Sequence, residues 1–316
     1  MTQIKEVYKL LQKEYGKQGW WPIINNKTLL CEYHKKAPKN KEEQFEIIIG
    51  CILAQNTGWY PNVVRAIQQL KLGRVLTKQE QEELRKAEIN QNKISRNGKL
   101  ITKDNILTQN TSWTNVEKAL YNLNKAKLLD IKKINKTKES EIASLIKPSG
   151  YFNQKANRLK IIAMHLLRRP ELLKEDNLRE ELLKIKGIGP ETADSIILYS
   201  AEKPSFVIDA YTKRIFSRLG FIDENSKYDE IKAYFENNLE KDVKIFKEYH
   251  ALIVEHAKRH CKTKPECKGC ILRSNCNFAS EKQTNQPVKN KVKPPNRSKL
   301  RGIPIPSRNK NQKSSL

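Results

Sequence analysis

The chain has 316 residues, more than one compact core of ordinary size holds, so we expect about two domains. A mean hydropathy of −0.72, with no apolar run near the roughly 18 residues that span a bilayer, excludes a membrane-embedded protein. The net charge of +26 makes DNA or RNA the expected partner, ahead of an acidic membrane surface or a lysine-rich composition with no partner.

The chain begins with two predicted helices. Residues 1–16 mix acids with lysines and lack an apolar segment, so no signal or transit peptide is expected and we place the protein in the cytoplasm, associated with the nucleoid. Apolar residues three and four apart predict a helix over residues 3–15. A strongly buried helix is expected over 45–54, with Glu42 and Glu43 in its first turn, where the helix dipole favours acids.

A near-repeat follows. The segment ILAQNTGWYPNVVRAIQQL (52–70) is echoed by ILTQNTSWTNVEKALYNL (106–123), and each copy places a predicted helix after a Gln-Asn-Thr turn. Two copies are too few for a solenoid, so we interpret them as a local duplication. The polar residues 71–105 between them are then an insert, either a surface helical hairpin or a loosely ordered loop.

Helical spacing continues through the rest of the body, and no segment alternates with the period of two that marks a half-buried strand. The predicted helices cover residues 138–147, 155–168, 177–185, 190–200, 209–219, 228–239 and 242–260. We therefore expect an all-α protein.

The C-terminal residues 279–316 differ from the body in composition. They contain ten Lys and Arg, one acid, many prolines and almost no large apolar side chains, so they cannot bury enough surface to offset the entropy of ordering. A disordered basic tail is predicted. The remaining residues still carry about +17, so the folded part should present its own docking face for nucleic acid.

The sequence KIKGIGPETADSI (184–196) interrupts an apolar helical pattern. It predicts two helices that fold back on each other, because glycine permits positive φ and close backbone approach, while Pro190 suits the first position of a helix. Amides at such a helix start fit a DNA phosphate, although an ordinary helix–helix turn has the same pattern. We assign DNA-backbone contacts to Lys186, Gly187, Ile188, Gly189 and Thr192.

Asp209 follows the apolar run 206–208 and opens the predicted helix 209–219. A plain N-cap aspartate explains this position. A catalytic carboxylate is compatible with it, because a helix N-terminus also keeps a carboxylate ionised.

Four of the six cysteines lie within sixteen residues, in the pattern Cys261-x5-Cys267-x2-Cys270-x5-Cys276. A cluster of this kind in a cytoplasmic protein indicates a metal rather than disulfides. Zinc ribbons usually pair two C-x-x-C knuckles, whereas this pattern has one, so the spacing favours a [4Fe–4S] cluster, with zinc as the alternative. Cys31 and Cys51 are expected to be ordinary small apolar residues.

The hairpin L-x-x-I-x-G-I-G-x-x-T-A, Asp209 after its apolar run, and the terminal cysteines together resemble the endonuclease III, or HhH-GPD, superfamily of helix-hairpin-helix DNA glycosylases. The resemblance covers residues 45–276 without the insert. The phrases ILTQNTSW and PSGYFNQKA (148–156) are similar to a branch of archaeal endonuclease III relatives and bacterial monofunctional 3-methyladenine glycosylases. The first gap between cysteines is one residue shorter than the better-known bacterial pattern.

The resemblance implies roles for two acids. Asp209 is the catalytic carboxylate, which stabilises positive charge on the sugar and deprotonates a water molecule. Glu191 occupies the position where bifunctional members carry the lysine that forms a Schiff base. A glutamate cannot form an imine, so the chain is expected to be monofunctional and to leave an abasic site.

The Gln-Asn-Thr turns resemble the wedge that fills the gap left by an everted base. We expect Gln55 and Asn56 in this role, with Gln109 and Asn110 as the alternative copy. A helix cap between packed helices explains either copy without DNA. Tyr151 and Phe152 could line the base pocket, and His250 is expected to be a hydrogen-bonded core histidine.

The expected architecture has two lobes with the active cleft between them. Residues 42–203 form a helical barrel with the hairpin, while residues 1–41 join 204–278, which carries Asp209 and the cluster. The main hypothesis is a monomeric base-excision repair enzyme acting on double-stranded DNA. A bifunctional glycosylase/lyase and a non-catalytic DNA-structure binder are the alternatives. Alkylated purines, oxidised pyrimidines, and uracil or thymine opposite guanine all stay open as substrates.

Overall fold

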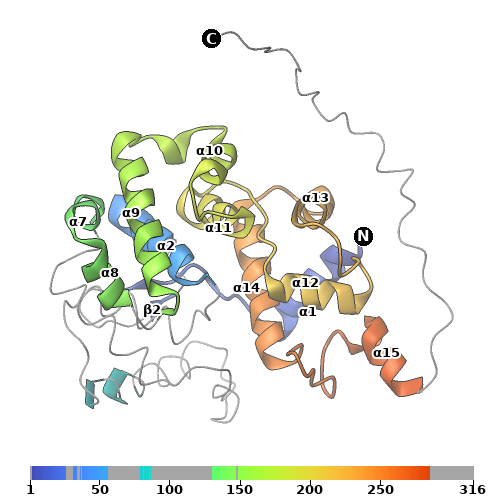
Figure 1. The fold of residues 1–316 in the computed structure, drawn as a ribbon. Coiled ribbons are helices and arrows are strands. Elements are labelled where there is room, and N and C mark those ends of the chain that lie inside the picture. Colours follow the sequence, from blue (N-terminus) through green and yellow to red (C-terminus); the bar gives the residue numbers. More distant parts are fainter. Residues whose placement is uncertain are drawn as a thin grey trace, which may run out of the picture.

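The computed structural model describes residues 2–25, 31–33, 36, 38–55, 79–80, 82–84, 86, 130–146 and 149–284. Figure 1 shows their helices in two neighbouring groups. One group holds α2 (Lys41–Leu53), α7 (Ile131–Lys136), α8 (Glu139–Ile146), α9 (Phe152–Arg168), α10 (Leu178–Lys184) and α11 (Pro190–Ser195). The other holds α1 (Gln3–Tyr15), α12 (Ala210–Leu219), α13 (Tyr228–Asn238), α14 (Val243–Arg259) and α15 (Asn277–Thr284). Short 3₁₀ turns lie at Leu172–Lys174 and Arg273–Asn275.

Helix α2 is the buried centre of the first group. Every residue from Phe45 to Leu53 is buried, so the helix is covered on all sides rather than along one stripe. Asn40 caps its start, accepting a hydrogen bond from the amide of Glu43 at 2.9 Å. The helix packs against α9, α11 and the residues that follow α11, and Gln55, just after its end, contacts the hairpin at Gly187.

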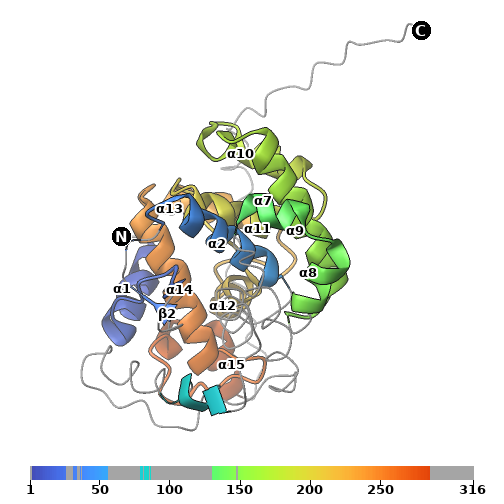
Figure 2. The same cartoon turned by 90° about the vertical axis from the view of Figure 1, so that its left-hand side faces the viewer.

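The N-terminal helix packs on α14, and both views show the two side by side (Figures 1 and 2). The hydroxyl of Tyr249 donates to the carbonyl of Ile4 at 2.8 Å, and the hydroxyl of Tyr15 lies 2.8 Å from Nδ1 of His256. The amphipathic pattern predicted for residues 3–15 is confirmed, since Ile4, Val7, Leu11 and Tyr15 are the buried residues of α1.

Two observations differ from the all-α expectation and the predicted tail. A small antiparallel pair joins β1 (Ile23–Ile24) to β2 (Cys31–Glu32); two-residue strands are too short to show alternation in a sequence. At the other end, α15 continues through Thr284, so the predicted disorder from residue 279 is wrong for the first residues of that segment. Ala279 is buried, which anchors the helix. Most of the insert 71–105 and residues 285–316 lie outside the described residues.

The predicted helix 190–200 changes geometry partway. It is α-helical through Ser195 and then makes one π-helical turn over Ile196–Ser200, closed by the Ala201 amide donating to the carbonyl of Ile196 at 3.0 Å. All five residues of this turn are buried. Among the described residues, none of the helices combines the length and apolar character that crossing a bilayer requires.

Candidate active site

An extended segment delivers Asp209 to the start of α12. Its apolar residues 206–208 are buried, so their amides need partners inside the protein. The amide of Phe206 donates to Oε1 of Glu236 at 2.9 Å, and the amide of Ile208 donates to the hydroxyl of Tyr228 at 3.3 Å. Side chains of α13 thus fix the backbone that presents Asp209.

The carboxylate of Asp209 has a neighbouring donor at each oxygen. Oδ1 accepts hydrogen bonds from the amide of Thr212 at 2.7 Å and from its hydroxyl at 2.8 Å, which makes Asp209 the N-cap of α12. Oδ2 lies 3.6 Å from Nε2 of His250. Burial acts to raise the pKa of Asp209, but His250 and the Thr212 donors outweigh it and hold the pKa below its ordinary value. The side chain is 14% exposed, so an ionised carboxylate remains within reach of a ligand.

Glu191, in the first turn of α11, lies near Asp209. The residue is exposed to solvent as a whole, yet protein atoms partly desolvate its carboxyl group. This loss of water, together with the nearby Asp209 charge, raises the pKa of Glu191 to about 7, with His250 acting in the opposite direction. The pKa values of the two carboxyl groups therefore differ. Asp209 stays charged at neutral pH, whereas Glu191 is partly protonated.

Glu191→Gln should stabilise the protein in a pH-dependent way. The folded state holds a proton on Glu191 more tightly than the unfolded state, so wild-type stability falls as pH rises from about 4.5 to about 7. Glutamine removes this loss. We expect the free energy of unfolding of the variant to exceed that of wild type by about 1 kcal/mol at pH 8, allowing for solvent screening, and to match it at pH 4. Denaturant unfolding at both pH values measures this; an equal difference at both would contradict it.

The hairpin between α10 and α11 turns at Gly187, which has φ of +91°. A Cβ atom there would lie 2.6 Å from Cγ of Arg158, so both backbone conformation and space require glycine. Gly189 differs from the expectation: its φ of −92° suits any residue, and a Cβ atom there would meet nothing within 4 Å. The absence of a side chain at Gly189 leaves open space at the start of α11.

Four of the five assigned DNA-backbone residues lie at this turn, but not all face outward. Lys186 is exposed, whereas the side chain of Ile188 is buried and its amide donates to the carbonyl of Ile185 at 3.0 Å. Ile188 therefore anchors the turn rather than reaching a ligand through its side chain. Within the described residues, no hydrogen bond uses the amides of Gly187 or Gly189, which leaves them available to an anion.

The two glycines allow a matched test. Gly187→Ala should lower the free energy of unfolding by about 1–3 kcal/mol, because it combines positive φ with a clash against Arg158. Gly189→Ala should leave stability within about 0.5 kcal/mol of wild type but weaken DNA binding, since its methyl group occupies the space in front of the amides. Denaturant unfolding and DNA titration check the pair. Equal stability losses in both variants would contradict the assignment.

Gln55, the predicted wedge, follows α2 and contacts the hairpin. Its Nε2 donates to the carbonyl of Gly187 at 3.0 Å and to the hydroxyl of Thr192 at 2.9 Å, while its Oε1 accepts a hydrogen bond from Arg158. The buried Thr192 side chain is thus a support for Gln55 rather than an exposed contact. The other predicted wedge residues, Asn56, Gln109 and Asn110, lie outside the described residues.

The predicted pocket residues Tyr151 and Phe152 have different surroundings. Tyr151 is 63% exposed, whereas Phe152 is half-buried and packs against the hydrophobic core, so only Tyr151 is open to stacking with a ligand. The buried Lys155 fixes this region to the end of α2, donating from Nζ to the carbonyls of Leu53 at 2.9 Å and Ser149 at 2.5 Å. Burial lowers the pKa of Lys155 to about 7.

His250 is the part of this site that the sequence did not reveal. Its position on the apolar face of α14 predicts a core histidine, and it is indeed 6% exposed. However, one edge of the ring faces Asp209 and the other lies 2.7 Å from the hydroxyl of Tyr199. No local pattern signals this contact, because α12 and α14 meet only through the tertiary fold.

A buried ion pair connects the hairpin to the segment that carries Asp209. The fully buried carboxylate of Asp194, in α11, receives two hydrogen bonds from Arg179 of α10, at 2.9 and 3.2 Å. The hydroxyl of Ser205, just before the extended segment, donates to the same carboxylate at 2.6 Å, and Lys232 of α13 lies 3.8 Å away. This Asp194 junction fixes the turn and Asp209 relative to each other.

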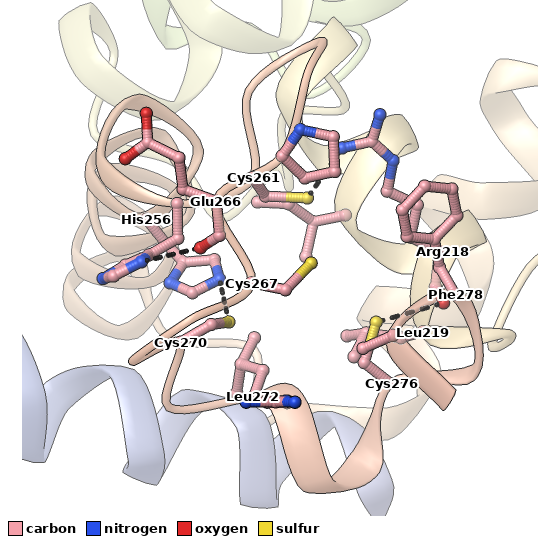
Figure 3. A pocket seen from close by; sticks show the side chains of 15 residues that line it. Arg218, Leu219, His256, Cys261, Glu266, Cys267, Cys270, Leu272, Cys276 and Phe278 are labelled. Carbon is pink, nitrogen blue, oxygen red and sulfur yellow. Dashed lines mark hydrogen bonds between the residues drawn. The ribbon is translucent and has the colours of Figure 1, made fainter. Parts of the chain in front are cut away.

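The four clustered cysteines line one pocket, which is partly open to solvent. Figure 3 shows their sulfur atoms turned toward this space. The lining also includes the apolar residues Ile215, Leu219 and Leu272, and His256, whose Nε2 lies 3.6 Å from Sγ of Cys270. Arg218 of α12 ties the loop to the body, donating to Sγ of Cys261 at 3.3 Å and to the carbonyl of Lys262 at 2.7 Å.

The spacing of these thiols bears on the kind of centre that they could hold. A single zinc ion bonds its thiolates at about 2.3 Å, which draws four sulfur atoms close together. No group of three or more His, Cys, Asp or Glu side chains in the described part of the chain is arranged to hold one ion. Four thiols that line one pocket supply the ligand type that both zinc and iron–sulfur clusters take.

Comparisons with known proteins place this geometry in context. A family model described as "HhH-GPD superfamily base excision DNA repair protein" matches residues 104–241. A protein of Methanocaldococcus jannaschii named as a candidate DNA repair glycosylase is 52% identical over 281 residues, 86% of this chain and 95% of that protein. Endonuclease III of Thermotoga maritima is 31% identical over 178 residues, 55% of this chain and 79% of that enzyme. A structure of endonuclease III in a non-covalent DNA complex matches with a TM-score of 0.57 at 16% identity, over 90% of this chain and 99% of that one.

Proposed function

We propose, from the premise that this chain belongs to the HhH-GPD superfamily of base excision DNA repair proteins, that it is a monofunctional DNA glycosylase. It would bind double-stranded DNA, evert a damaged or mismatched base and hydrolyse the N-glycosidic bond, leaving an abasic site. The observation that carries the proposal is the ionised, partly accessible carboxylate of Asp209 beside a glycine turn with free backbone amides.

The proposed chemistry assigns one task to each part of the site. Asp209 places a negative charge where positive charge develops on the sugar as the glycosidic bond breaks, and it can take a proton from the attacking water. The amides of Gly187 and Gly189, with the exposed Lys186, hold a phosphate of the same strand. Gln55 would leave its hairpin contacts and fill the gap in the duplex.

The monofunctional assignment rests on Glu191. A carboxyl group cannot attack the sugar carbon to form an imine, whereas a lysine amine at the same place could. Because Glu191 is close enough to Asp209 to feel its charge, a lysine introduced there would reach the same sugar. The carboxyl group at position 191 therefore limits the enzyme to base release.

Glu191→Lys should convert the enzyme into one that can be trapped on DNA. We expect borohydride to give a covalent complex with lesion-containing duplex for the variant and none above background for wild type, because only the variant places an amine beside the sugar. Glu191→Gln is the matched control, since it removes the charge without supplying an amine. Trapping of wild type at the yield of the variant would instead support a bifunctional glycosylase/lyase.

We assign the cysteine pocket to a [4Fe–4S] cluster held by Cys261, Cys267, Cys270 and Cys276. The fit rests on the four thiols that line one pocket, on the thiolate ligands that iron–sulfur clusters take, and on the single C-x-x-C in the spacing. When bound, the cluster supplies structural cross-links rather than reaction chemistry. The chain's own residues then present a basic loop to DNA, since Lys262, Lys264 and Lys268 lie between the ligands.

A panel of duplexes tests the proposal as a whole. Each duplex carries one lesion, drawn from alkylated purines, oxidised pyrimidines, and uracil or thymine opposite guanine. Base release that yields strand breaks only after alkali supports the monofunctional enzyme, and breaks without alkali support a lyase. Tight DNA binding with no base release from any duplex would support a non-catalytic DNA-structure binder.

A further inference from the structure

His250 makes two directed contacts that the proposed chemistry does not yet use. Its Nδ1 lies 2.7 Å from the hydroxyl of the fully buried Tyr199, and its Nε2 lies 3.6 Å from Oδ2 of Asp209. Within the described residues, Nε2 has no partner at hydrogen-bond distance. A buried polar nitrogen of this kind is costly unless it is completed by a partner, and the Asp209 carboxylate is the acceptor that it faces.

The two neighbours decide where the imidazole carries its proton. A lone pair on Nε2 would face an anionic oxygen and be repelled, so Nε2 must carry hydrogen. Nδ1 can then accept a hydrogen bond from the Tyr199 hydroxyl, or donate to it if the ring carries a second proton. In both cases the N–H at Nε2 points toward the Asp209 carboxylate.

Aromatic packing holds this arrangement in place. The Tyr199 ring belongs to the buried π-helical turn and packs against Trp21, with ring centroids 5.0 Å apart. Trp20 meets His250 edge-on at 6.5 Å. The imidazole is therefore enclosed on several sides, and its direction is set before any DNA binds.

We propose that His250 is a positioning residue for Asp209 and that Tyr199 selects the tautomer in which Nε2–H faces the carboxylate. The inference rests on the proposed glycosylase function, in which Asp209 acts on the sugar. Thr212 binds Oδ1, and His250 faces Oδ2 at 3.6 Å, so the carboxylate has a donor on each side. His250 also favours the ionised form of Asp209, the form that stabilises a cationic sugar.

Other titratable groups also interact with Asp209 and contribute to the pH dependence of its ionisation. Glu191 approaches from α11, Tyr199 from the π-helical turn and Tyr211 from α12 itself. Burial and the Asp209 charge raise the pKa of each of these three groups. Asp209 is thus the group that is charged at neutral pH, and His250 is the nearby donor that compensates it.

Paired substitutions separate positioning from space filling. His250→Leu fills the cavity without a donor, whereas His250→Gln retains an amide N–H that can reach Asp209. For single-turnover base release we expect a loss of about 30- to 100-fold for Leu, with the acid limb of the pH–rate profile moved to higher pH, and a loss of no more than about fivefold for Gln. Tyr199→Phe should cause a smaller loss, of about three- to tenfold.

Folded variants are compared after thermal unfolding and DNA titration have confirmed intact structure and binding. Equal losses for Leu and Gln, with an unmoved acid limb, would show that the imidazole only fills space and would overturn the proposal. Wild-type rates for Leu would overturn it as well.

The tautomer can be measured without any enzyme activity, so its test stands apart from that of the glycosylase function. In ¹⁵N spectra of histidine-labelled protein, with His250→Gln used for assignment, we expect the Nε2–H form in wild type. Asp209→Asn should shift His250 toward the Nδ1–H form, because an amide N–H then takes the place of Oδ2. An Nδ1–H form in wild type would overturn the inference even if base release is observed.

Discussion

Asp209→Asn is expected to reduce single-turnover base release by at least about 10²- to 10³-fold while leaving DNA affinity within about threefold of wild type. Of the two carboxyl groups of the site, only Asp209 is fully ionised at neutral pH, and the substitution removes its charge. Binding should persist, because the hairpin amides and basic residues that hold the backbone are untouched. Rapid-quench assays and DNA titration measure the two quantities.

The N-cap contacts of Asp209 make asparagine the right replacement. Asparagine can still accept the hydrogen bonds that Thr212 donates, so the start of α12 should stay intact and the variant should unfold within about 0.5 kcal/mol of wild type. Asp209→Ala loses both charge and cap and should cost about 1 kcal/mol more. Base release by the asparagine variant at the wild-type rate would remove Asp209 from the mechanism.

Cys267→Ser should abolish the proposed [4Fe–4S] centre and with it much of the stability of the C-terminal loop. Metal–thiolate bonds form only in the folded state, so their free energy is folding free energy, and we expect the loss of a ligand to lower unfolding stability by several kcal/mol. The broad visible absorbance of an anaerobically purified iron–sulfur protein should disappear, and DNA affinity should fall about tenfold as the basic loop loses its fixed shape.

Cys51→Ala is the control for this experiment. Cys51 is buried in α2 and is not among the residues that line the cysteine pocket, so its loss should leave the absorbance unchanged and cost only about 1 kcal/mol of packing. A colourless wild-type protein that contains one zinc ion would contradict the cluster assignment.

Local sequence pattern accounts for most of the helices in the described residues. The spacing of Ile4, Val7 and Leu11 marks α1, and the glycine turn with Pro190 marks the boundary between α10 and α11, because these signals act within a few residues. The β1–β2 pair and the helical continuation through α15 were missed. Both depend on tertiary packing, such as the burial of Ala279, that no short window contains.

The candidate site divides in the same way. Asp209, Glu191 and the four cysteines can be selected from sequence because each belongs to a short motif. His250 cannot, since its contact with Asp209 exists only where α14 crosses the start of α12. For the same reason, the sequence does not reveal that the side chains of Thr192 and Ile188 are buried, because they share a motif with exposed residues.

The Asp194 junction has a consequence for how such enzymes diversify. Because one buried carboxylate joins α10, α11 and the segment before Asp209, the turn proposed to bind the DNA backbone and the carboxylate proposed to act on the sugar form a single frame. Tyr151 lies outside this frame, exposed at the start of α9. Substrate specificity could therefore change through substitutions of such peripheral side chains, while the turn and the carboxylate of Asp209 stay the same.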